Sequence, residues 1–322
     1  MPGIIMHNHF AKIVYGSLSD ELKDVINNQN LYEFASYVPN VFLYRGLYSK
    51  KNRQYNKELY NMMHSTNIKA FLTNLANQCK MNKDLFAYLC GYLTHYYLDV
   101  FTNGFIVHKS GIYDPTINNS IRYRGLNQRM ERAMDSYIIE NYFNANPNNF
   151  NINRKIIRLK KLPKTIISDL DIVYEQVYDL SNAHKIINKS LACEKRFFFL
   201  IYDPIGFKNK IFSKIDNGKT VFDYNYLSYY NKSINSRKFD IFNFKHERWF
   251  NPVDDTITSI DSFFDLMEKA KKISMEAINA LYKYVYLDEE VDLSKYFVDI
   301  SMLTGLPSNV PCEFKYFNCV FK

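Results

Sequence analysis

Residues 84–105 read DLFAYLCGYLTHYYLDVFTNGF, and this stretch decides the fold that we expect. Its apolar residues recur with helical spacing, which predicts a long helix. His95 and Asp99 lie inside this pattern, four residues apart. Positions four apart project from the same face of a helix, so an imidazole and a carboxylate point the same way from an apolar surface. The apolar positions are Leu85, Leu89, Tyr92, Leu93, Tyr96, Tyr97 and Val100.

This polar pair needs a partner if the helix is buried. Burying a carboxylate without one costs several kcal/mol, as an order of magnitude, so a cation or a set of hydrogen-bond donors should lie beside Asp99. A metal ion would satisfy both side chains. A core histidine held by one hydrogen bond to the carboxylate would satisfy them equally well. For this helix alone, both interpretations stay open.

The composition of the chain favours helices over a turn-rich β fold. Only 10 glycines and 9 prolines occur in 322 residues, against an average of roughly 12% combined. The apolar content of 47% can fill a large core, in one big domain or two modest ones. Aromatic residues make up 16% of the chain, so we expect a core packed with rings. The sequence therefore predicts an all-α fold.

The net charge of the chain excludes few classes of binding partner. The net charge of +8 is mild and spread along the sequence, which suits an anionic substrate, a membrane surface, or neither. No block of basic residues interleaved with aromatics stands out, so we expect no nucleic-acid partner. The short basic run RLKKLPK, residues 158–164, is interpreted as a solvated helix end.

Cysteine use and hydropathy predict a cytoplasmic location. The five cysteines include no CxxC pair, which argues against a disulfide framework. The N-terminal residues lack the basic and apolar regions of a signal peptide. No run of 18 or more apolar residues occurs, so we expect no membrane span.

Further helices are expected on both sides of the central one. From about 203 to 258 the periodicity is lost, and a long irregular segment of this kind is often a lid. A strongly periodic helix follows, with Ser259 or Asp261 near its start. The expected helical ranges are 4–16, 18–32, 55–79, 84–105, 126–143, 164–197 (one helix or two) and 259–287.

Histidines and carboxylates occur on four of the helices expected in the first half of the chain. Metal sites in helical bundles are built in this way, from inward-pointing side chains on facing helices. Imidazole and carboxylate ligands suit zinc with one position left for water. The candidates are His7, His64, His95, Asp99, Glu131 and Asp135.

The order of these motifs resembles the zinc-dependent phospholipase C family, in its bacterial branch without a secretion signal. MPGIIMH resembles the family's start, PNVFLY its GPDxFFY element, and MHSTNIKAF its MH-plus-helix element. YLCGYLTHYYLDVFTN is similar to GFLCHYxLDxxxH, and LNQRMERAMD to HxRxExxID. In the second half, YDPIGFK, FNFKHERWFNP, SFFDLMEKA and TGLP resemble further elements of the same family.

This resemblance implies a multi-helix phospholipase C-like bundle formed by one domain, residues 1–322. Residues 1–150 would carry the metal site, and residues 151–322 the C-terminal helices and the lid-like segment. It also implies three zinc ions that activate a water to cut a phosphodiester of a phospholipid head group. Asp99 and the position of Asn40 would serve catalysis. The metal positions implied are Asn40, His64, His95 and Asp99 for one ion, and His7 and Asp99 with backbone groups of the amino terminus for a second. Asn103, Asn127 and Glu131 are implied for the third.

Three of these positions depart from the family pattern. Asn40 replaces an aspartate, and Asn103 and Asn127 replace histidines. A neutral amide is a poor zinc ligand beside imidazole or carboxylate. Glu131 alone cannot complete the third site, so we expect one or two zinc ions instead of three. Asp135 is expected to orient a ligand and not to bind metal itself.

Two functions remain open at this stage. The chain is either a phosphodiester hydrolase weakened by its asparagines, or a non-catalytic relative with a binding or structural role. The enzyme's partner would be a phospholipid head group or another phosphoester; peripheral membrane contact and the oligomeric state are left open. Glu131 has an ordinary alternative as well, namely a surface ion pair with Arg129, Arg132 or another basic side chain.

Other residues with site-like chemistry are expected to lie elsewhere. His9 and His108 are close to the motif histidines in sequence and could substitute for them, although no spacing requires it. His184 and His246 are expected outside the cluster. Asn243 and Trp249, together with His246, are interpreted as packing residues.

Overall fold

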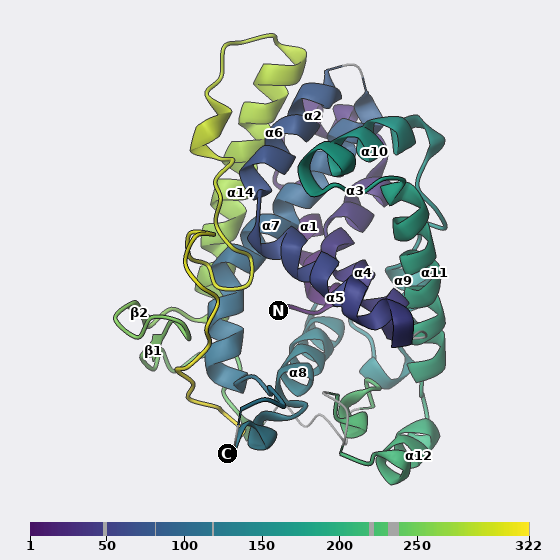
Figure 1. Ribbon diagram of the computed structural model, residues 1–322, viewed down its shortest axis with the longest axis vertical. Helices are drawn as coiled ribbons and strands as arrows, with labels where there is room; N and C mark the ends of the chain where they lie inside the picture. Colours follow the sequence, from purple (N-terminus) through teal and green to yellow (C-terminus); the bar gives the residue numbers. More distant parts are fainter. Residues whose placement is uncertain (48–49, 81, 118, 219–221, 231–237, 322) are drawn as a thin grey trace.

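The structure is a computed structural model that describes residues 1–322 except 48–49, 81, 118, 219–221, 231–237 and 322. The expectation of an all-α fold is confirmed: helices make up most of the chain (Figure 1). The α-helices are α1 (Ile4–Gly16), α2 (Asp20–Val25), α3 (Gln29–Ala35), α4 (Val38–Leu47), α5 (Lys50–Ser65), α6 (Ile68–Cys79), α7 (Lys83–Ser110), α8 (Leu126–Asn141), α9 (Ile152–Lys155), α10 (Lys164–Tyr178), α11 (Ala183–Ile201), α12 (Phe207–Ile215) and α14 (Phe263–Tyr286).

Helix α7 is the axis of the molecule, and it is longer than the sequence stretch that predicted it. Asn82 caps its start by accepting a hydrogen bond from the backbone of Leu85 at 3.1 Å, and Asp84 lies in the first turn. The helix ends at Gly111, whose φ of +67° stops a helix. Almost every residue of α7 is buried, because other helices surround it on all sides.

Helices α1, α3, α6 and α14 pack directly on α7. Helix α14 runs along α7 at the left of Figure 1, whereas α11 forms the opposite edge of the molecule and packs on α4. The crossing of α3 and α7 is close because Gly91 has no side chain: a Cβ there would lie 2.1 Å from the carbonyl oxygen of Tyr32. This packing fixes the region around residues 32–36 against the middle of α7.

Two expected helical ranges are each interrupted by residues with positive φ. The range 55–79 is divided between α5 and α6 at Asn67, whose φ is +54°. The range 164–197 is divided between α10 and α11 by Asp179 and Asn182, at +52° and +55°. Asparagine and aspartate tolerate a positive φ better than other non-glycine residues. The amino acids at these two breaks therefore suit the backbone conformation found there.

Two local expectations concern the ends of helices. Helix α14 begins at Phe263 and is capped by Ser262, which forms a capping box with Asp265, so Asp261 lies close to its start as expected. Residues 158–163 lie between helices and not at a helix end, because Ile157 and Leu162 are buried and tie the connection to the core.

In its described part, the segment expected to be irregular, residues 203–258, contains an α-helix that its composition did not predict. Helix α12 follows a turn at Gly206, and short 3₁₀ turns such as η3 (Tyr224–Tyr226) occur nearby. A minimal antiparallel pair, β1 (Trp249–Phe250) and β2 (Thr258–Ser259), aligns Trp249 with Ser259. Elsewhere, 3₁₀ turns are found at η1 (Ser120–Tyr123), η2 (Pro147–Asn149) and η5 (Leu293–Lys295). Within the described residues, no helix has the length and apolar character needed to cross a membrane.

Candidate metal centre

Four side chains from three helices meet at one point in the interior. His7 comes from α1, His64 from α5, and His95 and Asp99 from α7. The carboxylate of Asp99 lies between the rings: its Oδ1 is 3.3 Å from Nε2 of His7, and its Oδ2 is 3.3 Å from Nε2 of His95. Nε2 of His64 is 3.9 Å from the same Oδ2. We call these four residues the central cluster.

The inward-facing atoms of the central cluster are buried and unpaired. Each of the four residues is at most 1% exposed to solvent. Within the described part of the chain, the Nε2 atoms of all three histidines and both carboxylate oxygens of Asp99 have no hydrogen-bond partner. Buried polar atoms are nearly always satisfied in folded proteins, so five such atoms facing one another indicate a group that binds between them.

Two of the histidines are held by backbone carbonyls on their outer nitrogen. Nδ1 of His64 is 2.7 Å from the carbonyl oxygen of Tyr60, and Nδ1 of His95 is 3.0 Å from that of Ser36. A carbonyl only accepts, so each Nδ1 must donate its proton. In the neutral ring, Nε2 then carries the free lone pair, which is the form that a metal ion requires.

Aromatic stacking completes the enclosure of the rings. The rings of His7 and His95 stack with their centroids 4.4 Å apart, and the ring of His64 meets His95 edge-on at 5.5 Å. Tyr60 covers the other side of His64 at 4.0 Å. These contacts leave each imidazole little freedom to turn its Nε2 away from Asp99.

Burial determines the protonation of the central cluster. It lowers the pKa of His7 to about 3 and that of His64 to about 4, and it also lowers the pKa of His95. The three rings are therefore neutral at pH 7 and able to act as ligands. Burial raises the pKa of Asp99, while His95 and His64 oppose that rise.

The donor set and its spacing suit zinc. Zinc bound tetrahedrally at about 2.0–2.1 Å from nitrogen and oxygen ligands holds those ligands about 3.3 Å apart. The two shorter distances to Asp99 have this value, and the ligand atoms of His7, His95 and Asp99 all lie within 4.8 Å of one another. Three imidazoles with one carboxylate are typical zinc ligands, so the residues present fit the ion.

The residues expected at the third metal position make contacts with protein. Nδ2 of Asn103 donates to the carbonyl oxygens of Met302 and Leu303, both at 2.9 Å. Nδ2 of Asn127 donates to Oγ of Ser110 at 3.1 Å. The amide nitrogen of asparagine can donate hydrogen bonds to these oxygens, whereas an imidazole nitrogen that binds a metal ion carries no proton to donate.

Glu131 is not grouped with the central cluster among the described residues. Its Oε1 lies 3.7 Å from the amino group of Met1, and its side chain is partly exposed. Burial raises the pKa of Glu131, while the amino group and Arg132 oppose that rise. The ion pair that the structure records for Glu131 is thus with Met1 and not with Arg129 or Arg132.

Asn40 and Asp135 lie in two different settings. The Oδ1 atom of Asn40 is buried and has no hydrogen-bond partner in the parts of the chain described. Asp135 accepts from the backbone of Met6 at 2.9 Å and from the hydroxyl of Tyr229 at 2.7 Å. Asp135 therefore holds the first turn of α1, one residue from His7, by its backbone.

The other histidines lie away from the central cluster. His9 packs on Tyr142 with centroids 4.4 Å apart, and His108 packs edge-on against Phe250 at 4.2 Å. His184 pairs with Asp171 at 2.5 Å. None of the three belongs to the group of potential metal ligands found among the described residues.

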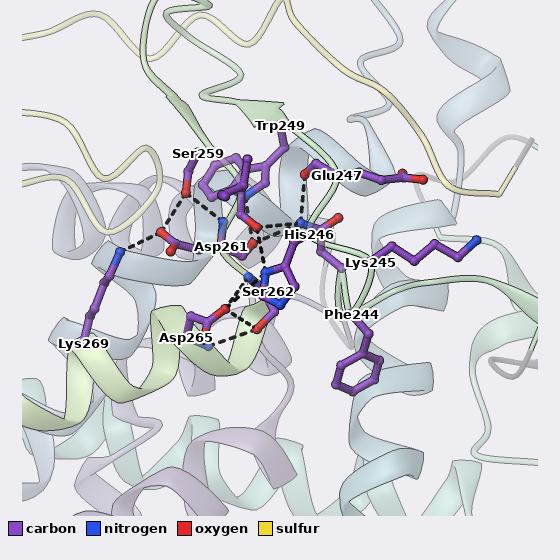
Figure 2. A network of polar contacts seen from close by, with 12 residues as sticks. Phe244, Lys245, His246, Glu247, Trp249, Ser259, Asp261, Ser262, Asp265 and Lys269 are labelled. Atoms are coloured by element: carbon purple, nitrogen blue, oxygen red, sulfur yellow. Dashed lines mark hydrogen bonds and ion pairs between the residues drawn. The ribbon is translucent and has the colours of Figure 1, made fainter.

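The region around Asn243 is a structural network, as expected. Nδ2 of Asn243 donates to the carbonyls of Glu247, Ile260 and Asp261, and the indole of Trp249 donates to Asp261 at 3.0 Å. Figure 2 shows the neighbouring residues of this network, including His246 beside Ser262 and Asp265 at the start of α14. These contacts hold residues 243–250 against the start of α14. They also give hydrogen-bond partners to Asn243, His246 and Trp249, the residues interpreted from sequence as packing residues.

Sequence reasoning missed the groups that orient the ligands. The carbonyls of Tyr60 and Ser36 hold two histidines, but a backbone carbonyl carries no side-chain signal. Tyr60 precedes His64 by four residues, so its contact could have been inferred from helix geometry. Tyr229, which donates to Asp135, comes from the irregular segment, where no sequence pattern indicated its contact with Asp135.

One comparison with known proteins finds a family for the chain. The family model described as zinc dependent phospholipase C matches residues 6–179, a range that contains every candidate site residue named above. No curated protein and no solved structure matches the chain.

Proposed function

Because this chain belongs to the zinc-dependent phospholipase C family, we propose that its central cluster binds zinc and acts on the phosphodiester of a phospholipid head group. One observation carries the proposal: the Nε2 atoms of His7, His64 and His95 and both oxygens of Asp99 converge, buried, with no hydrogen-bond partner among the described residues. These residues would hold the metal.

The central cluster could hold one ion or two. The two oxygens of Asp99 face different imidazoles, Oδ1 toward His7 and Oδ2 toward His95 and His64. Asp99 would therefore be a ligand whether the central cluster holds one ion or two. Nδ2 of Asn103 and Nδ2 of Asn127 donate to protein oxygens, while Oδ1 of Asn103 is buried with no hydrogen-bond partner among the described residues. A neutral amide oxygen is a poorer zinc ligand than the imidazole that the family pattern places there, which supports fewer ions than three.

The chain's own residues would prepare the site for hydrolysis. Zinc bound here would supply Lewis acidity, lowering the pKa of a water and offsetting the charge that develops on phosphate. The carbonyls of Tyr60 and Ser36 keep Nε2 of His64 and His95 free to act as ligands. Asp99 supplies the negative charge, and Asp135 holds the first turn of α1, which carries His7.

A non-catalytic role is the second candidate, and the burial of the ligands favours it. His64, His95 and Asp99 are each 0% exposed, so a substrate has no direct contact with them in this conformation. Structural zinc sites are closed in this way, whereas catalytic sites keep a position open to water. In that case zinc would stabilise the fold and the chain would serve a binding role.

Zinc content tests the metal site itself. We expect about one to two zinc ions per chain in protein purified without chelator, and a large loss in His95→Ala. His184→Ala is the matched control, because His184 also pairs with an aspartate but lies outside the central cluster. Less than about one zinc per ten chains, unchanged in His95→Ala, would contradict the proposal.

Hydrolysis then separates the two candidate functions. Zinc-loaded protein is incubated with a phosphocholine ester, and the release of phosphocholine is measured. Activity that is lost in Asp99→Asn but kept in Asp171→Asn, the partner of His184, supports the enzyme. Full zinc occupancy with no hydrolysis would favour the structural role.

A further inference from the structure

Helix α12 carries apolar side chains that the protein does not bury. Its sequence is FKNKIFSKI, and none of its nine residues is buried. Phe207 is 62% exposed, and Ile211 and Ile215 are exposed as well. These three residues follow one another at intervals of four, so they line one face of the helix. We call this face, with the exposed residues next to it, the α12 patch.

The end of α11 and the following turn extend the α12 patch. Phe199 is 70% exposed and Ile205 is 78% exposed. The ammonium of Lys208 in α12 lies 3.4 Å from the carbonyl oxygen of Phe199, so the two segments are in contact. Soluble proteins commonly expose single apolar residues, but a contiguous group of large ones marks an interaction site.

The structure holds the α12 patch in place from both ends. At the start of the helix, the carboxylate of Asp203 accepts from the backbone nitrogens of Lys208 and Asn209. At its end, the carboxylate of Asp216 accepts from Arg124 at 2.6 Å and from the backbone of Gly218. Figure 1 shows α12 projecting at the lower end of the molecule, beyond α11. The exposed apolar face is therefore a fixed surface of the fold.

Basic residues flank the apolar face of α12 on both sides. At about 100° per residue, Phe207, Ile211 and Ile215 span about 80° of the helix circumference. Lys214 falls about 20° and Lys210 about 60° outside one edge of this arc, and Lys208 falls about 20° outside the other edge. The helix contains no acidic residue. An apolar stripe between lysines is complementary to a surface with an apolar interior and a negatively charged boundary.

We propose that the α12 patch docks this protein on bilayers that contain anionic phospholipid. The side chains of Phe207, Ile211 and Ile215 would enter the boundary between head groups and acyl chains, and the lysines would contact the phosphates. This inference goes beyond the proposed function, because it does not depend on zinc or on hydrolysis. It assigns a surface to the membrane contact that the sequence left open.

Vesicle sedimentation tests the proposal on the full chain. The probes are vesicles of phosphatidylcholine alone and of phosphatidylcholine mixed equally with phosphatidylglycerol. We expect binding to the mixed vesicles that weakens as salt rises, because screening reduces the attraction of the lysines. Binding is measured with and without EDTA, so that a failure of the zinc site cannot be mistaken for a failure of the α12 patch.

Two pairs of variants divide the contributions of charge and apolar area. Lys210→Glu with Lys214→Glu should weaken binding at least about tenfold, since each basic residue near an anionic surface contributes about 1 kcal/mol. Lys185→Glu with Lys189→Glu is the matched control: the same charge change at the same spacing, toward the other end of α11. Ile211→Ser with Ile215→Ser should also weaken binding by about tenfold.

The apolar variant has a matched control, and two results would overturn the proposal. Ile257 and Ile260 are exposed near β2, on the opposite side of the molecule from α12 in Figure 1, and their change to serine should leave binding unaltered. Equal binding by the α12 variants and the controls would contradict the proposal. So would a dimer in vesicle-free sedimentation that Ile211→Ser with Ile215→Ser dissociates, because the α12 patch would then contact a second copy.

Discussion

At the residue scale, the central cluster depends on neutral histidines kept in one tautomer. Nδ1 of His64 and Nδ1 of His95 each donate a hydrogen bond to a backbone carbonyl oxygen, and this contact directs Nε2 of each ring toward Asp99. Burial removes water from the rings and lowers the pKa of His7 to about 3 and that of His64 to about 4. The same burial that prepares these side chains for a metal makes their protonation costly.

This cost predicts how the stability of the zinc-free protein changes with pH. A histidine in the unfolded chain has a pKa of about 6.5, so it binds a proton that the buried His7 or His64 does not bind. The free energy of unfolding should therefore be fully present above about pH 6.5 and fall as the pH drops toward 4. Urea unfolding in EDTA at a series of pH values measures this slope.

A variant of His7 tests whether the central cluster causes this pH dependence of the free energy of unfolding. His7→Gln removes one of the depressed groups, so its free energy of unfolding should depend less on pH between 6.5 and 4 than that of the wild type. Gly16→Ala, which removes no titratable group and whose Cβ meets no atom within 4 Å, should leave the slope unchanged. Identical slopes in all three proteins would mean that burial does not keep these histidines neutral.

At the scale of the elements, the site depends on how closely α3 approaches α7. Ser36, whose carbonyl holds His95, directly follows α3, and Gly91 lies on α7 four residues before His95. A Cβ at position 91 would fall 2.1 Å from the carbonyl oxygen of Tyr32 and 2.9 Å from the side chain of Ala35. Backbone does not yield to such a contact, so the crossing has room only for glycine.

The crossing predicts a specific effect for Gly91→Ala. We expect a loss of about 1–3 kcal/mol in the free energy of unfolding, and more if α3 cannot shift. Zinc affinity should fall as well, because moving α3 draws the Ser36 carbonyl away from His95. Gly16→Ala is the control, since a Cβ there meets no atom within 4 Å. Urea unfolding and zinc titration measure the two effects; equal results for both variants would contradict the close crossing.

At the scale of the whole molecule, the central cluster joins helices that are far apart in the sequence. It draws one ligand from α1, one from α5 and two from α7, and the backbone of His64 accepts from Met302 near the C-terminal end. A ligand bound between these helices would hold them together only in the folded chain. Zinc bound there should therefore stabilise the native state, whether or not the site is catalytic.

Thermal unfolding measures this stabilisation. With free zinc at about a hundred times its dissociation constant, mass action should add about 2.7 kcal/mol to the stability of the native state. The melting temperature should rise with zinc in the wild type and not in His95→Ala. His184→Ala should respond like the wild type, because its histidine is outside the central cluster. A zinc response retained in His95→Ala would place the metal elsewhere.

The sequence by itself determined the helical class and the long central helix, and it placed His95 and Asp99 on one face of that helix. Each of these follows from local spacing: apolar periodicity gives a helix its buried face, and positions four apart place His95 and Asp99 on one side of it. The break at Asn67 was missed, and the division of residues 164–197 was left open, because a polar residue that tolerates a turn does not have to make one.

Only the tertiary structure decided which partners these side chains met. In the folded chain, Asn103 donates to the Met302 and Leu303 carbonyls, and Asp135 accepts from the backbone of α1. The apolar face of α12 stays exposed. Periodicity states which face of a helix is apolar or polar, but not which distant segment covers that face. That choice is made when the whole chain packs, because every contact then competes for the same space and the same hydrogen-bonding groups.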